Sequence, residues 1–569
     1  KGAFDAINAG THKGVVVIKI NSSTTESASA ALNASGSGSA SYTSINIYPT
    51  TTGLSISGAL ALPLINLNGA HNVTIDGRVN ATGSTKSLTI TNTSTSSTAG
   101  TSTIRFIGDA STNTVQYCTL KGSSTDAAAG IVFFSTATTT GNDNNTITYN
   151  DITCSADASR PLNAIYALGT TAMNNDNNTI SNNNIYNFLS NGTASQGINI
   201  GSYNSGYTIS DNSFYETATF TATGVVNYNV ILINAATGSG NGFTISGNYI
   251  GGSAALCTGT AWTKTALYNA FTAISVTTAT GTANSIQGNT IQNINWTNSS
   301  SVDFIGIYLS GATVANIGTV TGNTIGAATG TGSISFTSTT TATDFWGINI
   351  ASTDVVSCQN NTIGSITVAN GSTYGSNIVV IYKSPSAGTT TISNNHIGSV
   401  STANSINASS ASSSNIQLVY GIKSGGTGTV TISSNTISNM ANATSNTITA
   451  IPGTISGIYV SSGTNTISNN TIYNLSNANA NTNITSGASV TGILMNSTTA
   501  AAQTVSGNTI YNLSNSYASF AGGVIGIYFN GGSTTQSTVN ANFIHSLSVS
   551  GASSTTADLY GIKINAGAT

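Results

Sequence analysis

The feature that most constrains this chain is a short internal repeat. A pattern of the form Thr-Ile-Ser-x-Asn-x-Ile, seen as TISNNNI, TISGNYI and TISNNTI, recurs twelve times with small variations. A period of this kind is typical of a solenoid that grows by stacking similar coils, so the usual estimate of domain number from length does not apply. The steps from the first shared asparagine to the last average near 36 residues. These asparagines are Asn150, Asn183, Asn212, Asn248, Asn289, Asn323, Asn361, Asn395, Asn435, Asn470, Asn508 and Asn542.

Each repeat has the composition of three short strands. A Gly-Ile-x-hydrophobic signal, as at Gly306, Gly421 and Gly457, precedes the shared asparagine in seven repeats. Within TIS and TI, hydroxyl residues alternate with isoleucine at period two, which is the signature of a half-buried strand. β-Branched residues, glycine and asparagine dominate, which disfavours helices, and the β-branched residues and the rarity of proline suit strands. We therefore predict an all-β, right-handed parallel β-helix with three strands per coil and long, variable third corners.

The shared asparagine has a structural explanation. The turn between the second and third strands needs a left-handed backbone, and asparagine tolerates that conformation better than most residues. Coils about 4.8 Å apart would let each side-chain amide bond to the next coil, at roughly 1 kcal/mol net per bond. We expect an internal asparagine ladder that is structural and not a binding site.

The repeat also sets the expected domain organisation. We expect one continuous β-helix over residues 1–569, with less regular coils over 1–117 and regular coils over 118–569. By the spacing, Cys118 and Arg78 occupy the asparagine position of the earlier coils. The sequence stops just after a first strand, so we expect a C-terminal continuation.

Charge and hydropathy exclude several classes of function. The chain has 12 Lys+Arg and 15 Asp+Glu, and the basic residues are scattered singly, which argues against nucleic acid and anionic lipid as partners. No apolar run is long enough for a transmembrane segment. The four cysteines, Cys118, Cys154, Cys257 and Cys358, lie too far apart for a zinc motif or a disulfide framework, and their disulfide state is left open.

Several segments resemble the large secreted β-helical repeat proteins of Bacteroidetes, which are exported by the type IX secretion system. The similar segments are AFDAINAGTH, LINLNGAHNVTIDGRVNATGSTKSLTITNTS, STIRFIGDASTNTVQYCTLKGSSTDAA, TISNNNIYNF and NYIGGSAALCTGTAWTKT. The resemblance implies a pectate-lyase-like fold and an extracellular or cell-surface location. Its members mostly have no assigned activity, so it implies fold more firmly than function.

An active site is not evident from the residues. β-Helical lyases and glycosidases need paired carboxylates or calcium ligands. Glutamate occurs only at Glu26 and Glu216, and no acidic residue occupies the outward first-strand positions that include Tyr308 and Tyr382. The histidines are too far apart in sequence to converge on a solenoid. We therefore expect no enzyme and no cofactor.

One acidic coincidence leaves a weak calcium site open. Asp143 and Asp176 each lie seven residues before their shared asparagine, in GNDNNTI and NNDNNTI, and should stack one coil apart. Two like charges at about 5 Å invite a cation, although calcium prefers more oxygen ligands than these two guarantee. Two solvated corner aspartates are the alternative.

Two outward faces could contact a ligand. Tyr308, Tyr382, Tyr459 and Tyr528 form a first-strand face suited to glycans or proteins, and ordinary stacking of tyrosines between coils is the alternative. The second strands present two columns of Thr and Ser, which resemble ice-binding surfaces but also fit the plain preference of exposed strands.

These observations lead to one expectation about function with alternatives. We expect an extracellular or cell-surface structural or adhesive solenoid without catalytic activity, whose partners are itself, other surface proteins or glycans. Exposed strand edges at the coil ends invite self-association. A glycan- or ice-binding rod is the alternative, and the residues favour a polysaccharide lyase or hydrolase least.

Overall fold

The computed structural model describes residues 1–371, 374–410, 412, 415–444, 453–497, 499–532, 535–551 and 553–566. The chain divides into two compact units. Unit 1 comprises Lys1–Ala218, Gly224–Thr260 and Ile274–Ser285, and unit 2 comprises Thr219–Thr223, Ala261–Ala273 and Ile286–Thr569. The expectation of one continuous helix over 1–569 stays a prediction.

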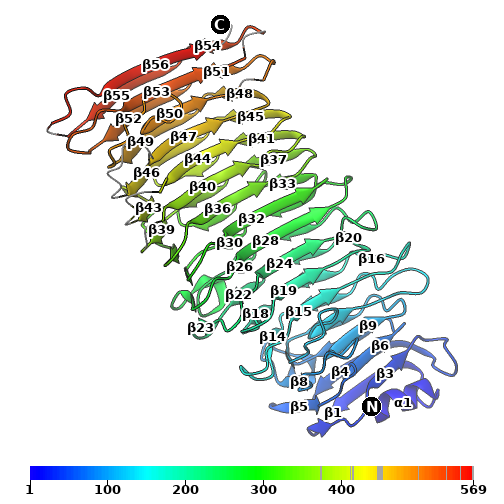
Figure 1. Ribbon diagram of the computed structural model, residues 1–569. Coiled ribbons are helices and arrows are strands. Elements are labelled where there is room, and N and C mark those ends of the chain that lie inside the picture. Colours follow the sequence, from blue (N-terminus) through cyan, green and yellow to red (C-terminus); the bar gives the residue numbers. More distant parts are fainter. Residues whose placement is uncertain are drawn as a thin grey trace. The chain divides into compact units, whose positions relative to one another are not determined.

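Both units are built from coils of three strands that stack in parallel (Figure 1). The GIYV-type strand of each repeat lies in sheet C, the TIS strand in sheet A and the strand after the shared asparagine in sheet B. This confirms the predicted right-handed parallel β-helix. Short helical segments are α1 (Gly2–Asn8), η1 (Val79–Ala81) and η2 (Ala255–Cys257). In the described part of the chain, no helix is long and apolar enough to cross a membrane.

Unit 1 contributes strands to all three sheets. Sheet A contains β1 (Gly14–Ile20), β4 (Tyr42–Pro49), β7 (Val73–Asp76), β10 (Thr114–Gln116), β13 (Thr146–Thr148), β17 (Thr179–Ser181), β21 (Thr208–Ser210) and β25 (Thr244–Ser246). Sheet B contains β2 (Thr24–Thr25), β5 (Leu54–Gly58), β8 (Leu88–Asn92), β11 (Cys118–Gly122), β14 (Asp151–Cys154), β18 (Asn184–Tyr186), β22 (Ser213–Tyr215) and β26 (Tyr249–Ile250). Sheet C contains β3 (Ala30–Asn33), β6 (Ile65–Asn68), β9 (Ile104–Ile107), β12 (Val132–Phe134), β15 (Asn163–Ala167), β19 (Ser195–Ile200) and β24 (Tyr228–Asn234), and β16 (Asn175–Asp176) pairs with β20 (Asn204–Ser205).

Unit 2 repeats the arrangement, with longer B strands. Sheet A contains β33 (Ala315–Ile317), β37 (Val356–Gln359), β41 (Thr389–Ser393), β45 (Thr429–Ser433), β48 (Thr464–Ser468), β51 (Thr504–Ser506) and β54 (Thr538–Asn540). Sheet B contains β23 (Phe220–Thr221), β27 (Trp262–Thr265), β30 (Thr290–Ile291), β31 (Ile294–Asn298), β34 (Thr324–Gly326), β35 (Ile334–Ser338), β38 (Thr362–Gly364), β39 (Ile366–Asn370), β42 (His396–Ile397), β43 (Ile406–Ser410), β46 (Thr436–Thr444), β49 (Thr471–Asn477), β52 (Thr509–Asn515) and β55 (Phe543–Val549). Sheet C contains β32 (Phe304–Gly311), β36 (Thr343–Ile350), β40 (Ser376–Lys383), β44 (Leu418–Ser424), β47 (Thr454–Val460), β50 (Val490–Met495), β53 (Gly523–Asn530) and β56 (Asp558–Ala566); β28 (Phe271–Thr278) and β29 (Asn284–Gln287) have residues in both units.

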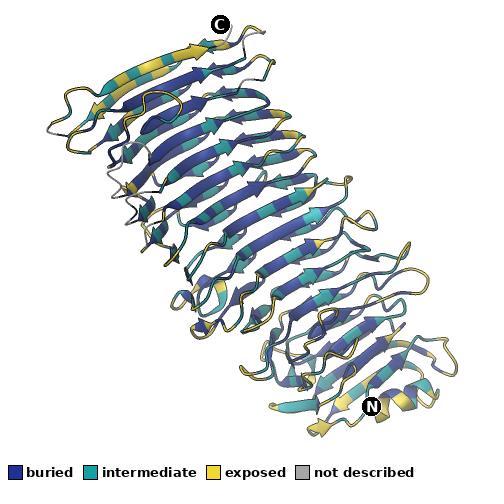
Figure 2. Cartoon of the chain, in the orientation of Figure 1, coloured by how far each residue is buried: buried dark blue, intermediate teal, exposed yellow. Residues whose placement is uncertain are grey.

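The core of each unit is a set of aligned columns of isoleucine. In unit 2, Ile307, Ile348 and Ile381 pair in register on β32, β36 and β40, and each is fully buried. Burying a side chain of this size contributes about 1.5–3 kcal/mol. Figure 2 shows the same pattern, with buried residues along the strands and exposed residues mainly in the corners.

The glycine of the Gly-Ile signal is explained by close packing. A Cβ at Gly421 would lie 2.6 Å from the carbonyl oxygen of Gly457 on the next coil and 2.7 Å from Cγ2 of Ile437 on sheet B. Both distances are too short for any side chain, so this position requires glycine for space and not for an unusual φ.

The asparagine ladder is present as hydrogen bonds, which confirms the predicted ladder. In each link, the backbone N–H and the side-chain amide of one asparagine both donate to Oδ1 of the asparagine on the next coil. The links within unit 1 join Asn150, Asn183, Asn212 and Asn248, and those within unit 2 join Asn289, Asn323, Asn361, Asn395, Asn435, Asn470, Asn508 and Asn542.

Two details of the ladder prediction were wrong: which residue of the turn is left-handed, and the placement of Arg78 in the ladder. The left-handed residue is the one before the ladder asparagine, as at Asn469 (φ 57°) and Asn394 (φ 56°), because the ladder residue must direct its amide inward. Cys118 does occupy the ladder position, and its N–H donates to Asn150 Oδ1 at 2.9 Å. Arg78 does not: the coil inserts η1 after it, and Leu88 pairs with Cys118 instead.

Candidate functional site

The four tyrosines of the predicted ligand face share one column on sheet C of unit 2. The column reads Tyr308, Asn349, Tyr382, Lys423, Tyr459, Leu494, Tyr528 and Lys563 on successive coils. The tyrosines therefore lie on alternate coils and do not form a continuous stack. At the C-terminal end, Tyr528 is 2% exposed and packs with Ala488, Leu494 and Ile525. Tyr528 is thus withdrawn from solvent.

A pair of aspartates lies on the same sheet, at the start of its first two strands in unit 2. Asp303 directly precedes Phe304, and Asp344 directly precedes Phe345, the residue paired with Phe304. Their backbones are therefore one coil apart, about 4.8 Å. Burial, together with the charge of Asp344, raises the pKa of Asp303 to about 6. We call Asp303 and Asp344 the carboxylate pair.

The surroundings of Asp344 hold its carboxylate in place. Asn377, the partner of Asp344 on β40, donates from Nδ2 to Asp344 Oδ1 at 2.8 Å. The orientation of the Asn377 side-chain amide is fixed through its oxygen, because Leu418 N–H donates to Asn377 Oδ1 at 2.9 Å. The pair thus combines a carboxyl group whose pKa is raised to about 6 with one whose oxygen accepts a hydrogen bond from a fixed amide.

Aromatic side chains and a lysine continue the face beside the carboxylate pair. Trp346 lies two residues beyond Asp344 on β36, and its ring centroid is 5.8 Å from that of Tyr382. Lys423 Nζ lies 5.2 Å from the ring centroid of Tyr382 and 5.4 Å from that of Tyr420. Burial lowers the pKa of Lys423, and Asp344 opposes that shift, so the lysine and the pair interact electrostatically. Aromatic rings beside polar groups are the usual means of holding a sugar ring.

The proposed calcium residues are adjacent, and the carboxylate of one of them, Asp143, is already hydrogen-bonded, whereas Asp176 Oδ1 is buried without a hydrogen-bond partner. The backbone N–H of Asp176 donates to Asp143 Oδ1 at 2.7 Å, so this carboxylate bonds the next coil. Burial raises the pKa of both groups, and the charges of Asp176 and Asp109 add to the shift at Asp143. Among the residues that the structure describes, no group of three or more His, Cys, Asp or Glu side chains could hold a metal ion. Calcium binding there stays a prediction, and among the described residues no third side chain of these types could join the two aspartates.

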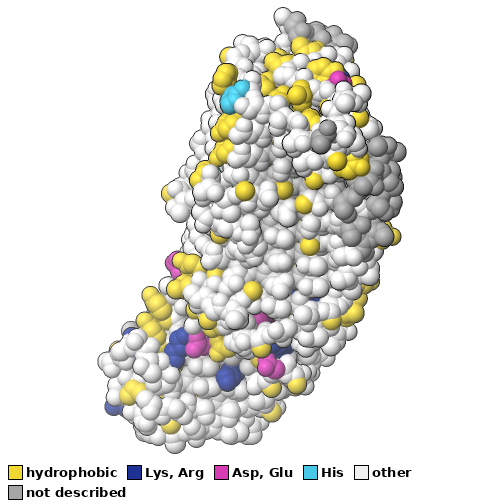
Figure 3. Space-filling view, turned by 90° about the vertical axis from the view of Figure 1, so that its left-hand side faces the viewer, with side chains coloured by type: hydrophobic (Ala, Val, Ile, Leu, Met, Phe, Trp, Pro, Cys, Tyr) yellow, Lys and Arg dark blue, Asp and Glu magenta, His cyan; other side chains and the backbone are white. Residues whose placement is uncertain are grey.

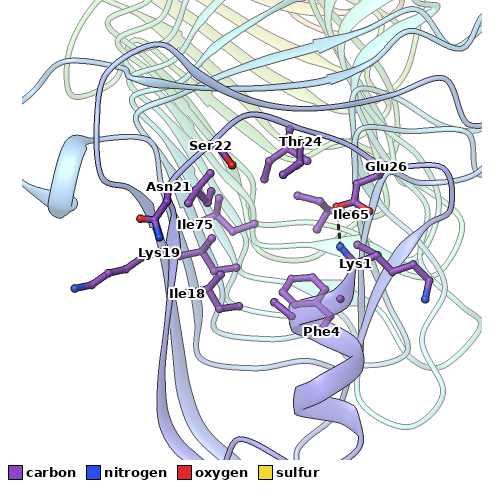
Figure 4. A pocket seen from close by; sticks show the side chains of 16 residues that line it. Lys1, Phe4, Ile18, Lys19, Asn21, Ser22, Thr24, Glu26, Ile65 and Ile75 are labelled. Atoms are coloured by element: carbon purple, nitrogen blue, oxygen red, sulfur yellow. Dashed lines mark hydrogen bonds and ion pairs between the residues drawn. The ribbon is translucent and has the colours of Figure 1, made fainter.

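A cavity of about 410 Å³ lies at the first coil of unit 1. Figure 4 shows Phe4, Ile18, Ile65 and Ile75 around it, and the α-amino group of Lys1 donates to Glu26 Oε1 at 2.8 Å at its rim. The walls are mainly apolar, and this polar pair satisfies itself. The cavity therefore offers hydrophobic contact but no convergent groups for acid–base chemistry.

Sequence reasoning missed the carboxylate pair although a signal for it exists. Asp303 and Asp344 begin the related segments DFIGI and DFWGI, 41 residues apart. The prediction considered the outward positions after the Gly-Ile signal and overlooked positions three residues before the glycine. Because β32 and β36 begin before the glycine of the Gly-Ile signal, side chains at those earlier positions lie on the same face of sheet C.

No family model and no curated protein matches the chain. Among solved structures, the chain is similar to the A-module of the mannuronan C-5 epimerase AlgE6 of Azotobacter vinelandii, at 12% identity over 88% of this chain and 91% of that chain, with a TM-score of 0.26. It is also similar to the PL6 family alginate lyase AlyGC, at 10% identity over 99% of each chain, with a TM-score of 0.16.

This finding corrects the expected function. The expectation of a structural or adhesive solenoid without catalytic activity is contradicted, because the similar structures are an epimerase module and a lyase, which by their names act on polysaccharides. At these TM-scores the likeness assigns no activity to this chain, so any activity has to be argued from its own residues. The resemblance to the secreted Bacteroidetes proteins stays a prediction.

Proposed function

We propose that unit 2 binds a polysaccharide along sheet C and hydrolyses its glycosidic bonds with the carboxylate pair. The observation that carries the proposal is the position of Asp303 and Asp344 on adjacent coils, with a pKa of about 6 for Asp303, beside Trp346. Glycoside hydrolysis uses two carboxyl groups with different roles, one as acid and one as nucleophile. Backbones one coil apart, about 4.8 Å, would allow the carboxyl separation of about 5 Å that is typical of enzymes that retain the anomeric configuration.

The chemistry follows from those roles. Protonated Asp303 donates its proton to the glycosidic oxygen as the bond from that oxygen to the anomeric carbon breaks, while an oxygen of Asp344 bonds to the same carbon. Asp303, now ionised, takes a proton from water, and the resulting hydroxide displaces Asp344. The products are two shorter chains, and both carboxyl groups return to their starting states. Trp346 and Tyr382 would hold the sugar rings on either side of the cleaved bond.

The test uses the full chain and a panel of soluble polysaccharides, both neutral and anionic. Reducing ends are measured for the wild type, Asp303→Asn, Asp344→Asn and the control Asp354→Asn, an aspartate of unit 2 on the corner after β36. We expect cleavage by the wild type and the control, a loss of at least about 100-fold in both pair variants, and a rate that falls as pH rises above 6. Equal rates in wild type and Asp303→Asn would overturn the catalytic role. Binding without cleavage would instead support the expectation that the chain is not an enzyme.

We also propose an extracellular location and export by the type IX system. What supports this is the resemblance of the segments quoted above to secreted Bacteroidetes repeat proteins, together with a chain that is only 5% charged. Fractionation of the native cells is the test: recovery of the protein from the cytosol alone would refute it.

A further inference from the structure

A second surface of unit 2, on sheet B, has features of its own. The strands β46, β49, β52 and β55 each bend at one residue in the left-handed region. These residues are Asn439, Asn474, Asn512 and Ser546, with φ between 53° and 55°. Each bend turns the strand without ending it, so the residues on both sides of the bend pair in register from coil to coil.

The bends form the floor of an open groove of about 440 Å³. One wall carries Ser476, Ser514 and Ser548, which pair in register. We call this surface the asparagine groove. None of the described residues that line it is Lys, Arg, Asp or Glu. Figure 3, which faces the left-hand side of Figure 1, agrees: charged side chains gather in the lower part of that face and are sparse in the upper part.

The floor is a second amide ladder, distinct from the buried one. Asn474 Nδ2 donates to Asn439 Oδ1 at 3.1 Å, and Asn512 Nδ2 donates to Asn474 Oδ1 at 3.1 Å. Each of these bonds uses one hydrogen of the donor amide and one lone pair of the acceptor. An asparagine side chain has two of each, so Asn474 and Asn512, which are not buried, retain hydrogen-bonding capacity on the surface, whereas Asn439 is buried and also donates to Ser399 O.

A column of rings follows the floor on the side opposite the serines. Tyr473 and Tyr511 stack with centroids 4.9 Å apart and planes 1° apart, and His545 continues the stack at 5.0 Å and 4°. Rings stacked on one another cover each other's faces, so they present edges and polar tips to a neighbouring molecule. The groove is therefore bordered by polar groups that repeat once per coil.

We propose that the asparagine groove binds an uncharged polysaccharide chain that runs along the stacking direction of the coils. Amide, serine hydroxyl and tyrosine hydroxyl groups repeat at about the coil spacing, roughly 4.8 Å, and match the repeated hydroxyls of such a chain. An anionic polymer would find no cation in the groove to offset the loss of its hydration. The groove shares a polysaccharide ligand with the proposed function but not its site, and its binding needs no turnover.

The test removes amides without disturbing the backbone. Glycine adopts positive φ without strain, so Asn474→Gly with Asn512→Gly deletes two floor amides and keeps the bends. The matched control is Asn394→Gly, another left-handed and exposed asparagine of unit 2 that lies outside the groove. Affinity electrophoresis of the full chain in gels containing mannan, xylan or alginate supplies the binding constants, and melting curves verify folding.

We expect the double variant to lose at least about ten-fold in affinity for a neutral polymer, while the control binds like the wild type. Tyr473→Phe with Tyr511→Phe, which keeps the ring stack and deletes the hydroxyls, should weaken binding by a smaller factor. Unchanged affinity in a folded double variant, a wild-type preference for alginate, or no binding to any polymer would each overturn the proposal.

The two proposals fail separately. Asp303→Asn and Asp344→Asn should bind neutral polymer through the groove as the wild type does. Conversely, the double glycine variant should cleave short soluble oligosaccharides at the wild-type rate. Loss of cleavage with retained groove binding in the aspartate variants would thus support both, and loss of groove binding in those variants would place the ligand on sheet C instead.

Discussion

Replacing Asn470 by alanine tests how much one position of the buried ladder contributes to stability. Oδ1 of Asn470 accepts from the N–H and the side-chain amide of Asn435, at 3.0 and 2.9 Å. Its own amide donates to Ile432 O and to Asn508 Oδ1, both at 3.0 Å, and to Ser468 O at 3.1 Å. The side chain is fully buried, so water does not replace these bonds in the native state. Alanine removes all five interactions at once.

The magnitude follows from those five bonds. A net hydrogen bond contributes about 1 kcal/mol, and a buried donor left without an acceptor costs about 1–3 kcal/mol. Asn470→Ala deletes the three bonds that its amide donates, about 3 kcal/mol, and leaves the two donors of Asn435 without an acceptor, about 2–6 kcal/mol, so we expect a loss of about 5–9 kcal/mol in the local free energy of opening. Asn542→Ala is the comparison, because that residue is more exposed and its Oδ1 also accepts from two donors of one neighbour, Asn508. There we expect about 1–2 kcal/mol.

Hydrogen exchange with mass spectrometry is the suitable assay, because a stack of coils need not unfold in one step. Asn470→Ala should accelerate exchange in β45, β48 and β51, while strands several coils away should change little. The reasoning would be refuted if exchange in these strands equalled that of the wild type, or if Asn542→Ala had the larger effect. Either result would mean that packing of the isoleucine columns, and not the ladder, sets local stability.

Three further predictions concern buried titratable groups. The pKa of Asp303 is raised to about 6, so the folded chain holds a proton that the unfolded chain releases between about pH 4 and 6. Stability therefore falls as pH rises across that window, by about 1–2 kcal/mol after allowing for partial exposure. Urea denaturation should show this fall in the wild type and not in Asp303→Asn. Burial lowers the pKa of Lys264 to about 7, so the unfolded chain binds more protons between about pH 7 and 10.5, and stability rises with pH there. The free energy of unfolding measured by denaturation at pH 7 and 10 should show this rise in the wild type and not in Lys264→Met. The same rise in both proteins would contradict the prediction. Burial also raises the pKa of the Cys118 and Cys358 thiols, so a thiol reagent should label them only after unfolding, and rapid labelling of the native protein would contradict their burial.

The ladder could be predicted from sequence because asparagine recurs at the same position of the repeat in coil after coil. The left-handed residue could not be told from its neighbour, since both are asparagine in segments such as Asn469–Asn470. Only the structure shows that the second of the two directs its amide to the next coil. Period and composition therefore predict the coil, while the division of roles within its turn depends on contacts between coils.

The candidate site was harder to predict, for two physical reasons. Asp303 and Asp344 interact across coils 41 residues apart, so their proximity depends on the length of an intervening irregular corner. The burial of Tyr528 depends on another corner, where successive asparagines fix the chain: Asn481 N–H donates to Asn479 Oδ1, and Asn483 N–H donates to Asn481 Oδ1. Such local turns have no fixed period, so a repeat does not indicate which part of a face they will cover.

The uniform link between coils also bears on how such a chain can change over evolutionary time. The segments Thr471–Asn477 and Thr509–Asn515 are identical, TIYNLSN, and each follows directly on a ladder asparagine. Because Asn470 and Asn508 make the same bonds to their neighbours, a gene duplication that copied the intervening coil would create no new kind of contact. The number of coils can therefore vary independently of the coil's design, and the asparagine groove would lengthen with each copy while the carboxylate pair stayed single.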